Sequence, residues 1–171
     1  RSLADAGYET RAFAFTPSEE AKTLATAQGI LRSPPRSRHE RSDPVIPLGG
    51  GVTGDVAGFA AAVYRRGVPA VQCPTTLLAM VDASVGGKTG VNLEAPGALL
   101  KNVVGAFHQP SLVLCDVSLL ATLPEAEFRG GLAECIKHGL IGADWRDPDL
   151  LEWTGSSLGP ILARDEADVV Q

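Results

Sequence analysis

The chain has 171 residues, of which 44% are hydrophobic and 20% charged, and its net charge is -5 at pH 7. That length and composition can form one domain, or parts of two, around an apolar core. The acidic balance gives no sign of a nucleic-acid partner, and no apolar run approaches the roughly 20 residues of a membrane-spanning helix, so we expect neither nucleic acid nor a membrane as a partner.

Three cysteines, Cys73, Cys115 and Cys135, lie in apolar stretches without a C-x-x-C pair or a disulfide framework. We expect them to be reduced and buried, in a protein of the cytoplasm. Met80 is the only methionine, and the last residues keep a helical pattern without a stop signal, so we expect a piece of a longer protein. A plastid is the alternative compartment, because a targeting segment would have been lost with the natural start.

The first predicted element is a helix from residue 16 to about residue 31. Thr16 has the character of an N-cap, Pro17 suits the first helical position, and Glu19 completes a capping box. Residues 33–43, with two prolines and alternating charges, predict an exposed connection.

A glycine-rich segment after a short apolar run is the most informative motif. Residues 44–48 predict a buried strand, and Gly49, Gly51 and Gly54 fit G-x-G-x-x-G. Residues 56–66 then predict a helix whose free N–H groups can face a phosphate, which indicates a dinucleotide site. The acidic residue expected about 20 positions further on is missing, so the ordinary Rossmann pattern is incomplete.

Strand, loop and helix then recur. A strand at 68–73 precedes a helix that begins near Thr75, and a last apolar strand lies at 112–115. This order predicts an α/β fold with a Rossmann-like parallel sheet over residues 1–118. Ligands of such sheets bind at the carboxyl ends of the strands, where the glycine segment and the Thr75 loop both lie.

Residues 119–171 predict the start of an α-helical second domain. Thr122 to Glu125 forms a second capping-box pattern before a helix at 125–141, and further helices are predicted at 147–154 and 156–171. The apolar stripe of the helix at 125–141 consists of Phe128, Leu132, Cys135 and Ile136.

Several polar residues lie in or beside glycine-bearing loops. Gly86-Gly87-Lys88-Thr89 ends like a P-loop, but Asp82 occupies the position of the required first glycine, so a P-loop is disfavoured. Lys88, Lys101, Asn102 and Arg66 instead suit a phosphorylated small molecule.

Glu134 and Lys137 lie three positions apart and face the same side of the predicted helix. A surface ion pair is the simpler interpretation, and Glu134 with His138 is also compatible with a metal site. The spacing leaves the roles of His39, His108 and His138 open.

The order of motifs carries a family resemblance. From about residue 19 to residue 140 the chain resembles 3-dehydroquinate synthases, which bind NAD on a variant of the Rossmann fold. Eight motifs occur in the family's order: GGGVTGDVAGF, YRRG, PTTLLA, VDASVGGKTG, KN, GAF, TLP and GLAECIK. The segment 93–100 before Lys101 is longer than the family's usual turn.

The resemblance implies an NAD site in the first domain. Glu19 and Lys22 match residues that reach the adenosine ribose, and Gly50, Gly51 and Asp55 match the loop at the pyrophosphate and nicotinamide. The remaining positions implied at the cofactor are Thr75, Thr76, Leu78, Asp82, Lys101, Thr122, Leu123 and Glu127.

It also implies a sugar-phosphate site with a metal. Substrate contacts fall on Asp82, Lys88, Lys101, Asn102 and Lys137, of which Asp82, Lys88 and Lys137 are the implied catalytic residues. Arg66 matches an arginine that the family delivers from the partner subunit, which implies a homodimer. Glu134 matches one ligand of a zinc ion, with Co²⁺ as the alternative metal. The family's two other ligands are histidines expected beyond Gln171, so we expect these 171 residues alone to be inactive.

The implied reaction is a phosphorus–oxygen lyase step of the shikimate pathway. It converts 3-deoxy-arabino-heptulosonate 7-phosphate to 3-dehydroquinate and phosphate, for aromatic amino-acid biosynthesis, and NAD is recycled. Two alternatives are a relative that cyclises sedoheptulose 7-phosphate and a non-catalytic NAD-binding remnant.

Overall fold

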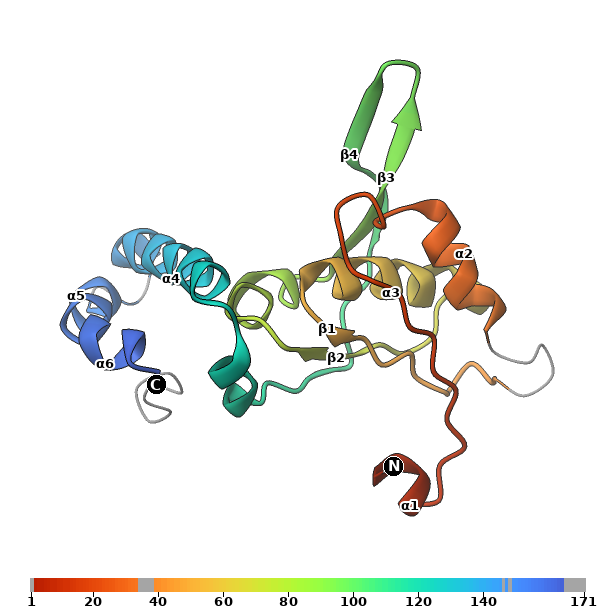
Figure 1. The fold of residues 1–171 in the computed structure, drawn as a ribbon, viewed down its shortest axis with the longest axis horizontal. Coiled ribbons are helices and arrows are strands. Elements are labelled where there is room, and N and C mark those ends of the chain that lie inside the picture. Colours follow the sequence, from red (N-terminus) through yellow and green to blue (C-terminus); the bar gives the residue numbers. More distant parts are fainter. Residues whose placement is uncertain (1, 34–38, 146, 148, 165–171) are drawn as a thin grey trace.

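A short parallel sheet lies at the centre of the computed structural model, which describes residues 2–33, 39–145, 147 and 149–164. The strand order is β1 (Leu48–Gly49), β2 (Val71–Pro74) and β5 (Leu112–Val113). Helix α3 (Gly51–Val63) packs on this sheet, and α2 (Leu24–Arg32) lies beside α3 (Figure 1). The predicted α/β fold with a parallel sheet is confirmed.

Strand β1 is shorter than the predicted strand at 44–48. An isolated bridge from Val45 to Ala70 continues the pairing with the chain before β2, but Pro44 and Pro47 have no N–H group for a regular ladder. The Cys73 N–H donates to the Pro47 carbonyl at 2.8 Å, so the backbone pairing continues between these points. The strand therefore precedes the helix that carries the glycines, as predicted, but the regular strand begins at Leu48 and not at residue 44.

Helix α3 begins five residues earlier than predicted. Gly50 is its N-cap, with φ -78° and ψ -172°, so Gly51 and Gly54 lie inside the helix. Val56 and Ala60 are fully buried, and Val56 belongs to an apolar cluster with Ala27 of α2 and Val91. A 3-10 turn, Tyr64–Arg66, ends the helix.

The predicted start of the first long helix is wrong. Helix α2 begins at Leu24, and Thr23 is its N-cap because its hydroxyl accepts the Thr26 N–H at 3.2 Å. Glu19 is not part of a capping box: its carboxylate accepts a hydrogen bond from Asn92, far along the chain. A four-residue helix, α1 (Ser2–Asp5), precedes this region, and residues 34–38 of the predicted connection lie outside the described residues.

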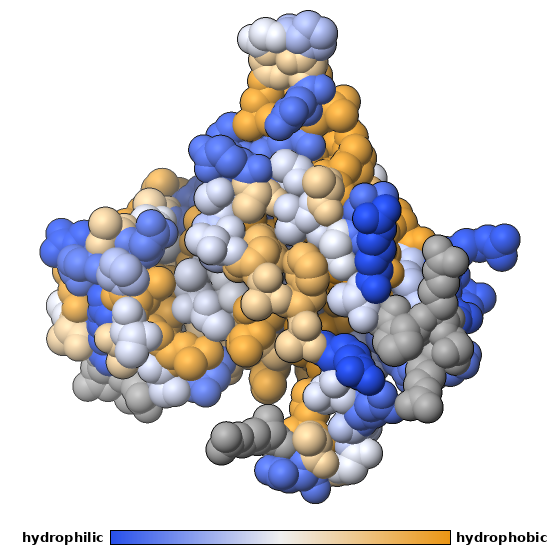
Figure 2. Space-filling model, turned by 45° about the vertical axis from the view of Figure 1, so that its right-hand side comes forward, coloured by the Kyte–Doolittle hydropathy of each residue, from blue (hydrophilic) through white to orange (hydrophobic). Residues whose placement is uncertain are grey.

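An antiparallel hairpin projects from the body of the molecule (Figure 1), and the sequence did not predict it. It consists of β3 (Lys88–Ala95) and β4 (Ala98–Phe107), joined at Gly97, whose φ is 79°. Its base packs on the helices, with Val91 fully buried in one cluster with Phe59. Figure 2 shows apolar surface on the projecting part, where Leu93, Leu99, Leu100 and Val103 are exposed.

Helices form the other end of the described chain. A π-helical turn (Ala79–Ala83) and a 3-10 helix (Val117–Thr122) lead to α4 (Glu125–Trp145), α5 (Leu150–Ser156) and α6 (Leu158–Leu162). Their shared core is Leu77, Leu120, Phe128, Leu132 and Ile161. No helix among the described residues has the length and apolar character needed to cross a membrane.

Several details of the helical part differ from the predictions. Helix α4 starts at Glu125 as predicted, but the Thr122 hydroxyl donates to the Leu119 carbonyl at 3.2 Å and does not cap the helix. Ile136 is 39% exposed, so the predicted apolar stripe is wrong at this residue. All three cysteines are free, but none is fully buried as expected: Cys73 and Cys135 are half-buried, and Cys115 is exposed, two residues beyond the end of β5. The last predicted helix extends into residues 165–171, outside the described part.

Candidate active site

The glycine segment brings two loops into close contact. A Cβ atom on Gly50 would lie 3.2 Å from Thr76 Cγ2, and one on Gly51 would lie 3.3 Å from Ala83 Cβ. The Thr75 N–H donates to the Gly49 carbonyl at 2.9 Å. The start of α3, with its free N–H groups, therefore lies directly beside the loop after β2, as predicted from the strand order.

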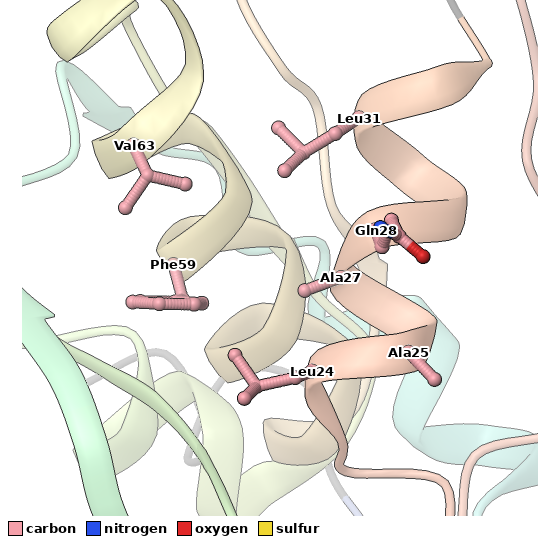
Figure 3. Close-up of a pocket in the computed structure, with 7 residues that line it drawn as sticks. All are labelled: Leu24, Ala25, Ala27, Gln28, Leu31, Phe59 and Val63. Atoms are coloured by element: carbon pink, nitrogen blue, oxygen red, sulfur yellow. The ribbon is translucent and has the colours of Figure 1, made fainter.

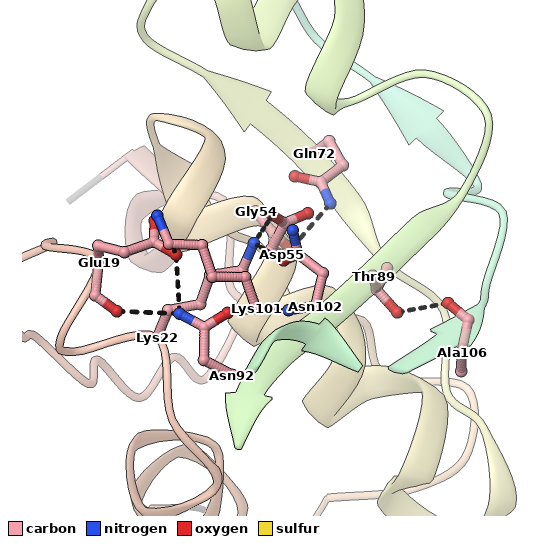
Figure 4. A network of polar contacts seen from close by, with 10 residues as sticks. All are labelled: Glu19, Lys22, Gly54, Asp55, Gln72, Thr89, Asn92, Lys101, Asn102 and Ala106. Atoms are coloured by element: carbon pink, nitrogen blue, oxygen red, sulfur yellow. Dashed lines mark hydrogen bonds and ion pairs between the residues drawn. The ribbon is translucent and has the colours of Figure 1, made fainter. Parts of the chain in front are cut away.

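A buried lysine connects three distant segments (Figure 4). Lys22 is 6% exposed, and its Nζ lies 2.5 Å from Asp55 Oδ2 on α3 and 2.5 Å from Asn102 Oδ1 on β4. Burial raises the pKa of Asp55, and Lys22 opposes this shift only in part. The structure thus joins two predicted cofactor residues, Lys22 and Asp55, to a predicted substrate residue, Asn102.

Glu19 lies at the outer side of this network. Its Oε1 accepts the Asn92 amide at 2.8 Å and lies 3.5 Å from Lys101 Nζ. The hydrogen bond from Asn92 lowers the pKa of Glu19, and the charges of Lys101 and Lys22 lower it further. Lys101 is therefore placed near the predicted ribose residue, and its side chain is 61% exposed.

A polar cavity of about 520 Å³ lies between α3, the π-helical turn and the hairpin. It brings four predicted site residues into one lining: Asp55, Asp82, Lys88 and Asn102. The rest of the wall is without charge and consists of Ala83, Val85, Thr89, Gly90, Val103, Gly105, Ala106 and Phe107. Opposite charges thus face one hollow space, which suits a ligand that carries both hydroxyl and phosphate groups.

Helix α4 contributes a second charged cluster. Lys137 Nζ contacts Glu134 Oε1, and His138 Nε2 lies 3.9 Å from the same oxygen. One ligand atom from each of Asp82, Glu134 and His138 lies within 4.8 Å of the others, a spacing that could hold a metal ion. Asp82 also lines the cavity, so the two groups of residues meet there.

Other predicted residues lie outside the cavity. Arg66 is exposed in the 3-10 turn that follows the C-terminal end of α3, whereas Asp55 lies in the first half of that helix. Its φ of 68° and that of Arg65, 47°, are left-handed and rare for residues with a Cβ atom. Thr122 and Leu123 lie just before α4 and Glu127 lies in its first turn, and the three line neither described cavity. Leu78 is 43% exposed.

A second hollow between α2 and α3 has a different character (Figure 3). It also measures about 520 Å³, and it carries no charged side chain in its lining: Leu24, Ala25, Ala27, Gln28, Leu31, Phe59 and Val63. It lacks the groups that would orient a phosphate or a sugar. The polar cavity is therefore the candidate active site.

Two buried polar residues were missed by the sequence reasoning. Asn92 is 3% exposed and contacts Glu19 and Asn102, and Gln72 is 5% exposed and donates from Nε2 to the Gly54 carbonyl at 3.3 Å. Each is an amide between two apolar residues: Gln72 lies between Val71 and Cys73, and Asn92 lies between Val91 and Leu93. Because buried amides need partners, this pattern was a usable signal.

Comparison with known proteins identifies the family. The family model described as 3-dehydroquinate synthase N-terminal matches residues 12–130. This chain belongs to the 3-dehydroquinate synthase family. It is 48% identical over 166 residues to the 3-dehydroquinate synthase of Symbiobacterium thermophilum, covering 97% of this chain and 44% of that protein. It is 52% identical over 165 residues to that of Cereibacter sphaeroides, covering 96% and 42%. The chain spans less than half the length of these curated relatives.

Solved structures show the same fold. The chain resembles 2-epi-5-epi-valiolone synthase from Streptomyces hygroscopicus subsp. jinggangensis, with NAD⁺ and Zn²⁺ bound, at 34% identity and a TM-score of 0.79, covering 91% of this chain and 42% of that one. It also resembles 2-deoxy-scyllo-inosose synthase in complex with carbaglucose-6-phosphate, NAD⁺ and Co²⁺, at 34% identity and a TM-score of 0.68, covering 74% and 33%. An iron-containing alcohol dehydrogenase, at 16% identity and a TM-score of 0.62, shares the fold.

Proposed function

We propose that this chain provides the NAD-binding part of a 3-dehydroquinate synthase. The whole enzyme converts 3-deoxy-arabino-heptulosonate 7-phosphate to 3-dehydroquinate and phosphate. The observation that supports this best is that Asp55 of α3 and Lys88 and Asn102 of the hairpin line the same cavity. Identity to 3-dehydroquinate synthases, 48% and 52%, exceeds the 34% to the two sugar-phosphate cyclases of other specificity.

NAD fits the residues at the start of α3. A side chain on Gly50 would crowd Thr76, and one on Gly51 would crowd Ala83, so glycine lets the start of the helix lie close to the facing segments and leaves its N–H groups open to a pyrophosphate. We propose Gly50, Gly51 and Asp55 for the pyrophosphate and nicotinamide, and Glu19 with Lys22 for the ribose. The other proposed cofactor residues are Thr75, Thr76, Leu78, Asp82, Lys101, Thr122, Leu123 and Glu127. When bound, NAD supplies a hydride acceptor that is regenerated within the cycle.

The cations of the cavity suit a dianionic phosphate. Lys88 and Asn102 line the wall that faces Asp82, and these three residues are proposed to hold the sugar phosphate. Lys101 and Lys137 would contact the substrate from the hairpin and from α4. Asp82 and Lys88 line the cavity, and Lys137 contacts Glu134, which lies in one cluster with Asp82. These three, Asp82, Lys88 and Lys137, are the proposed catalytic residues, because hydroxyl protons and phosphate charge must be stabilised there.

A zinc ion, with Co²⁺ as the alternative, fits the donor set around Glu134. Carboxylate oxygen and imidazole nitrogen are ordinary zinc ligands, and Asp82, Glu134 and His138 offer both kinds within one small space. Glu134 is the proposed family ligand. Its contact with Lys137 implies that metal binding and this ion pair compete for one oxygen.

Three further proposals concern the oligomeric state, the location and the domain division of the enzyme. The position of Arg66, far along α3 from Asp55, supports its delivery to the cavity of a partner subunit in a homodimer. The cytoplasm is the proposed location. The division into an NAD-binding domain at 1–118 and a helical domain from 119 remains our interpretation of the chain.

A chimeric enzyme tests the proposed function. Residues 1–171 would replace the matching region of the Symbiobacterium thermophilum relative, and phosphate release from the heptulosonate phosphate would be measured. We expect turnover, and a loss of at least about 100-fold in Lys88→Ala, because the cation that neutralises the phosphate is removed. Phosphate release should also fall strongly in Lys137→Ala. NAD titration of Lys22→Ala distinguishes the loss of the network around Lys22, which weakens NAD binding, from the loss of a phosphate contact, which does not.

The alternatives give different results in the same assay. Turnover of sedoheptulose 7-phosphate in preference to the heptulosonate phosphate would favour the other cyclases. A folded chimera that binds NAD and converts neither sugar would favour a non-catalytic remnant.

A further inference from the structure

The pairing of the hairpin is irregular where it crosses the active site. Val91 of β3 pairs with Val104 of β4. Two residues further along β3, Leu93 pairs with Leu100, which lies four residues back along β4. Asn92 therefore faces a longer stretch of β4 than a regular ladder allows. Such bulges bend a strand and re-aim its side chains, often beside active sites.

The bulged stretch carries Lys101 and Asn102. Asn102 has a φ of 57°, a left-handed conformation that is costly for a residue with a Cβ atom unless its surroundings hold it. The Asn102 N–H has no regular ladder partner at this point. It donates instead to Asn92 Oδ1 at 3.0 Å.

The other end of the same amide holds Glu19. Asn92 Nδ2 donates to the Glu19 backbone carbonyl at 3.2 Å and to Glu19 Oε1 at 2.8 Å. The backbone N–H of Asn92 donates to the Lys22 carbonyl at 2.8 Å. A side chain that is only 3% exposed thus bonds the segment at 19–22 on one side and the bulge on the other (Figure 4).

We propose that Asn92 is a positioning residue that fixes the cofactor carboxylate Glu19 and the substrate amide Asn102 in one arrangement. The inference rests on the proposed function of these two residues. No other amino acid offers a donor group and an acceptor at the same reach: aspartate lacks the donor, and an aliphatic side chain lacks both. Asn92 itself does not line the polar cavity, so it acts through its neighbours.

Two variants of the 171-residue chain separate the two ends of the amide. Asn92→Asp keeps an acceptor for the Asn102 N–H but places an oxygen against the Glu19 carboxylate. We expect hydrogen exchange at the Asn102 amide to stay within about twofold of wild type, and the Kd for NAD to rise about tenfold or more. Asn92→Ala removes both ends, so exchange should also quicken about tenfold or more. Leu93→Ala, at the exposed neighbour, is the matched control and should change neither.

The results test the role of Asn92 separately from the proposed NAD-binding function. An Asn92→Asp chain that binds NAD as tightly as wild type, or an Asn92→Ala chain with unchanged exchange at Asn102, overturns it. Should Asn92→Ala fail to fold, Asn92→Asp alone decides, since it retains the bond to the bulge. A wild-type chain that does not bind NAD overturns the proposed function and the Glu19 half of the inference, and the exchange data still decide the Asn102 half.

Discussion

At the scale of residues, the network around Lys22 shows how burial and charge are balanced. A lysine that is only 6% exposed needs partners, and Asp55 and Asn102 supply oxygens at 2.5 Å each. The sequence alone assigned these residues to cofactor and substrate by resemblance. It did not reveal their direct contact, because the three positions come from segments far apart in the chain.

Glu19 provides a pH-dependent test of this network. Its pKa lies below the ordinary value of 4.5, so its contribution to the free energy of unfolding is present above about pH 4.5 and is lost as the pH falls through the lowered pKa of the folded state. Glu19→Gln should lower the free energy of unfolding by less than about 1 kcal/mol near neutral pH, because its side chain is 38% exposed and solvent screens its charge. Urea unfolding across a pH series measures this, and a difference that stays constant into acid would contradict it.

At the scale of elements, close packing explains why α3 carries so many glycines. A Cβ atom on Gly58 would lie 2.6 Å from Thr89 Cγ2 on the hairpin. Thr89 is held there because its hydroxyl donates to the Ala106 carbonyl at 2.8 Å. The hairpin thus packs against the helix backbone, which brings Lys88 near Asp55.

Replacing Gly58 tests this packing. Gly58→Ala should lower the free energy of unfolding by about 1–3 kcal/mol, because Thr89 cannot move without losing its bond. Gly130→Ala is a matched control: Gly130 lies within α4, and a Cβ atom there would meet no neighbouring segment within 4 Å among the described residues, so the same change should stabilise by about 0.5–1 kcal/mol. Thermal unfolding of both variants gives the answer, and equal effects at the two positions would refute the packing account.

The elements also show what the sequence could and could not predict. The glycine segment at the start of α3 and the start of α4 at Glu125 were readable from local patterns, although the first residue of α3 was placed five positions too late. The start of α2 was misread because Thr16-Pro17 and Thr23 both suit a helix start, and tertiary bonds of Glu19 decide between them. The hairpin was missed because its pairing depends on a bulge, which leaves no simple alternation.

At the scale of the whole molecule, Arg66 and the polar cavity lie at opposite ends of α3. If the enzyme is a homodimer in which this arginine enters the partner's site, chimeric subunits with Arg66→Ala and with Lys88→Ala should complement one another. Each heterodimer would then hold one intact composite site and up to half the activity of the wild-type dimer. Isolated heterodimers without any recovered phosphate release would place Arg66 outside the partner's site.

The central claim is that the start of α3 and the polar cavity bind NAD through Asp55, and titration calorimetry of NAD into the 171-residue chain tests it most directly. We predict saturable binding that Asp55→Asn weakens about tenfold or more, because a charged hydrogen bond is worth about 1.5–3 kcal/mol. Asp43→Asn makes the same change in an exposed turn outside the cavity, where the carboxylate accepts the Glu40 N–H at 2.7 Å, and it should leave the Kd unchanged. Absence of NAD binding by the wild-type chain, or an unchanged Kd in Asp55→Asn, would contradict the account.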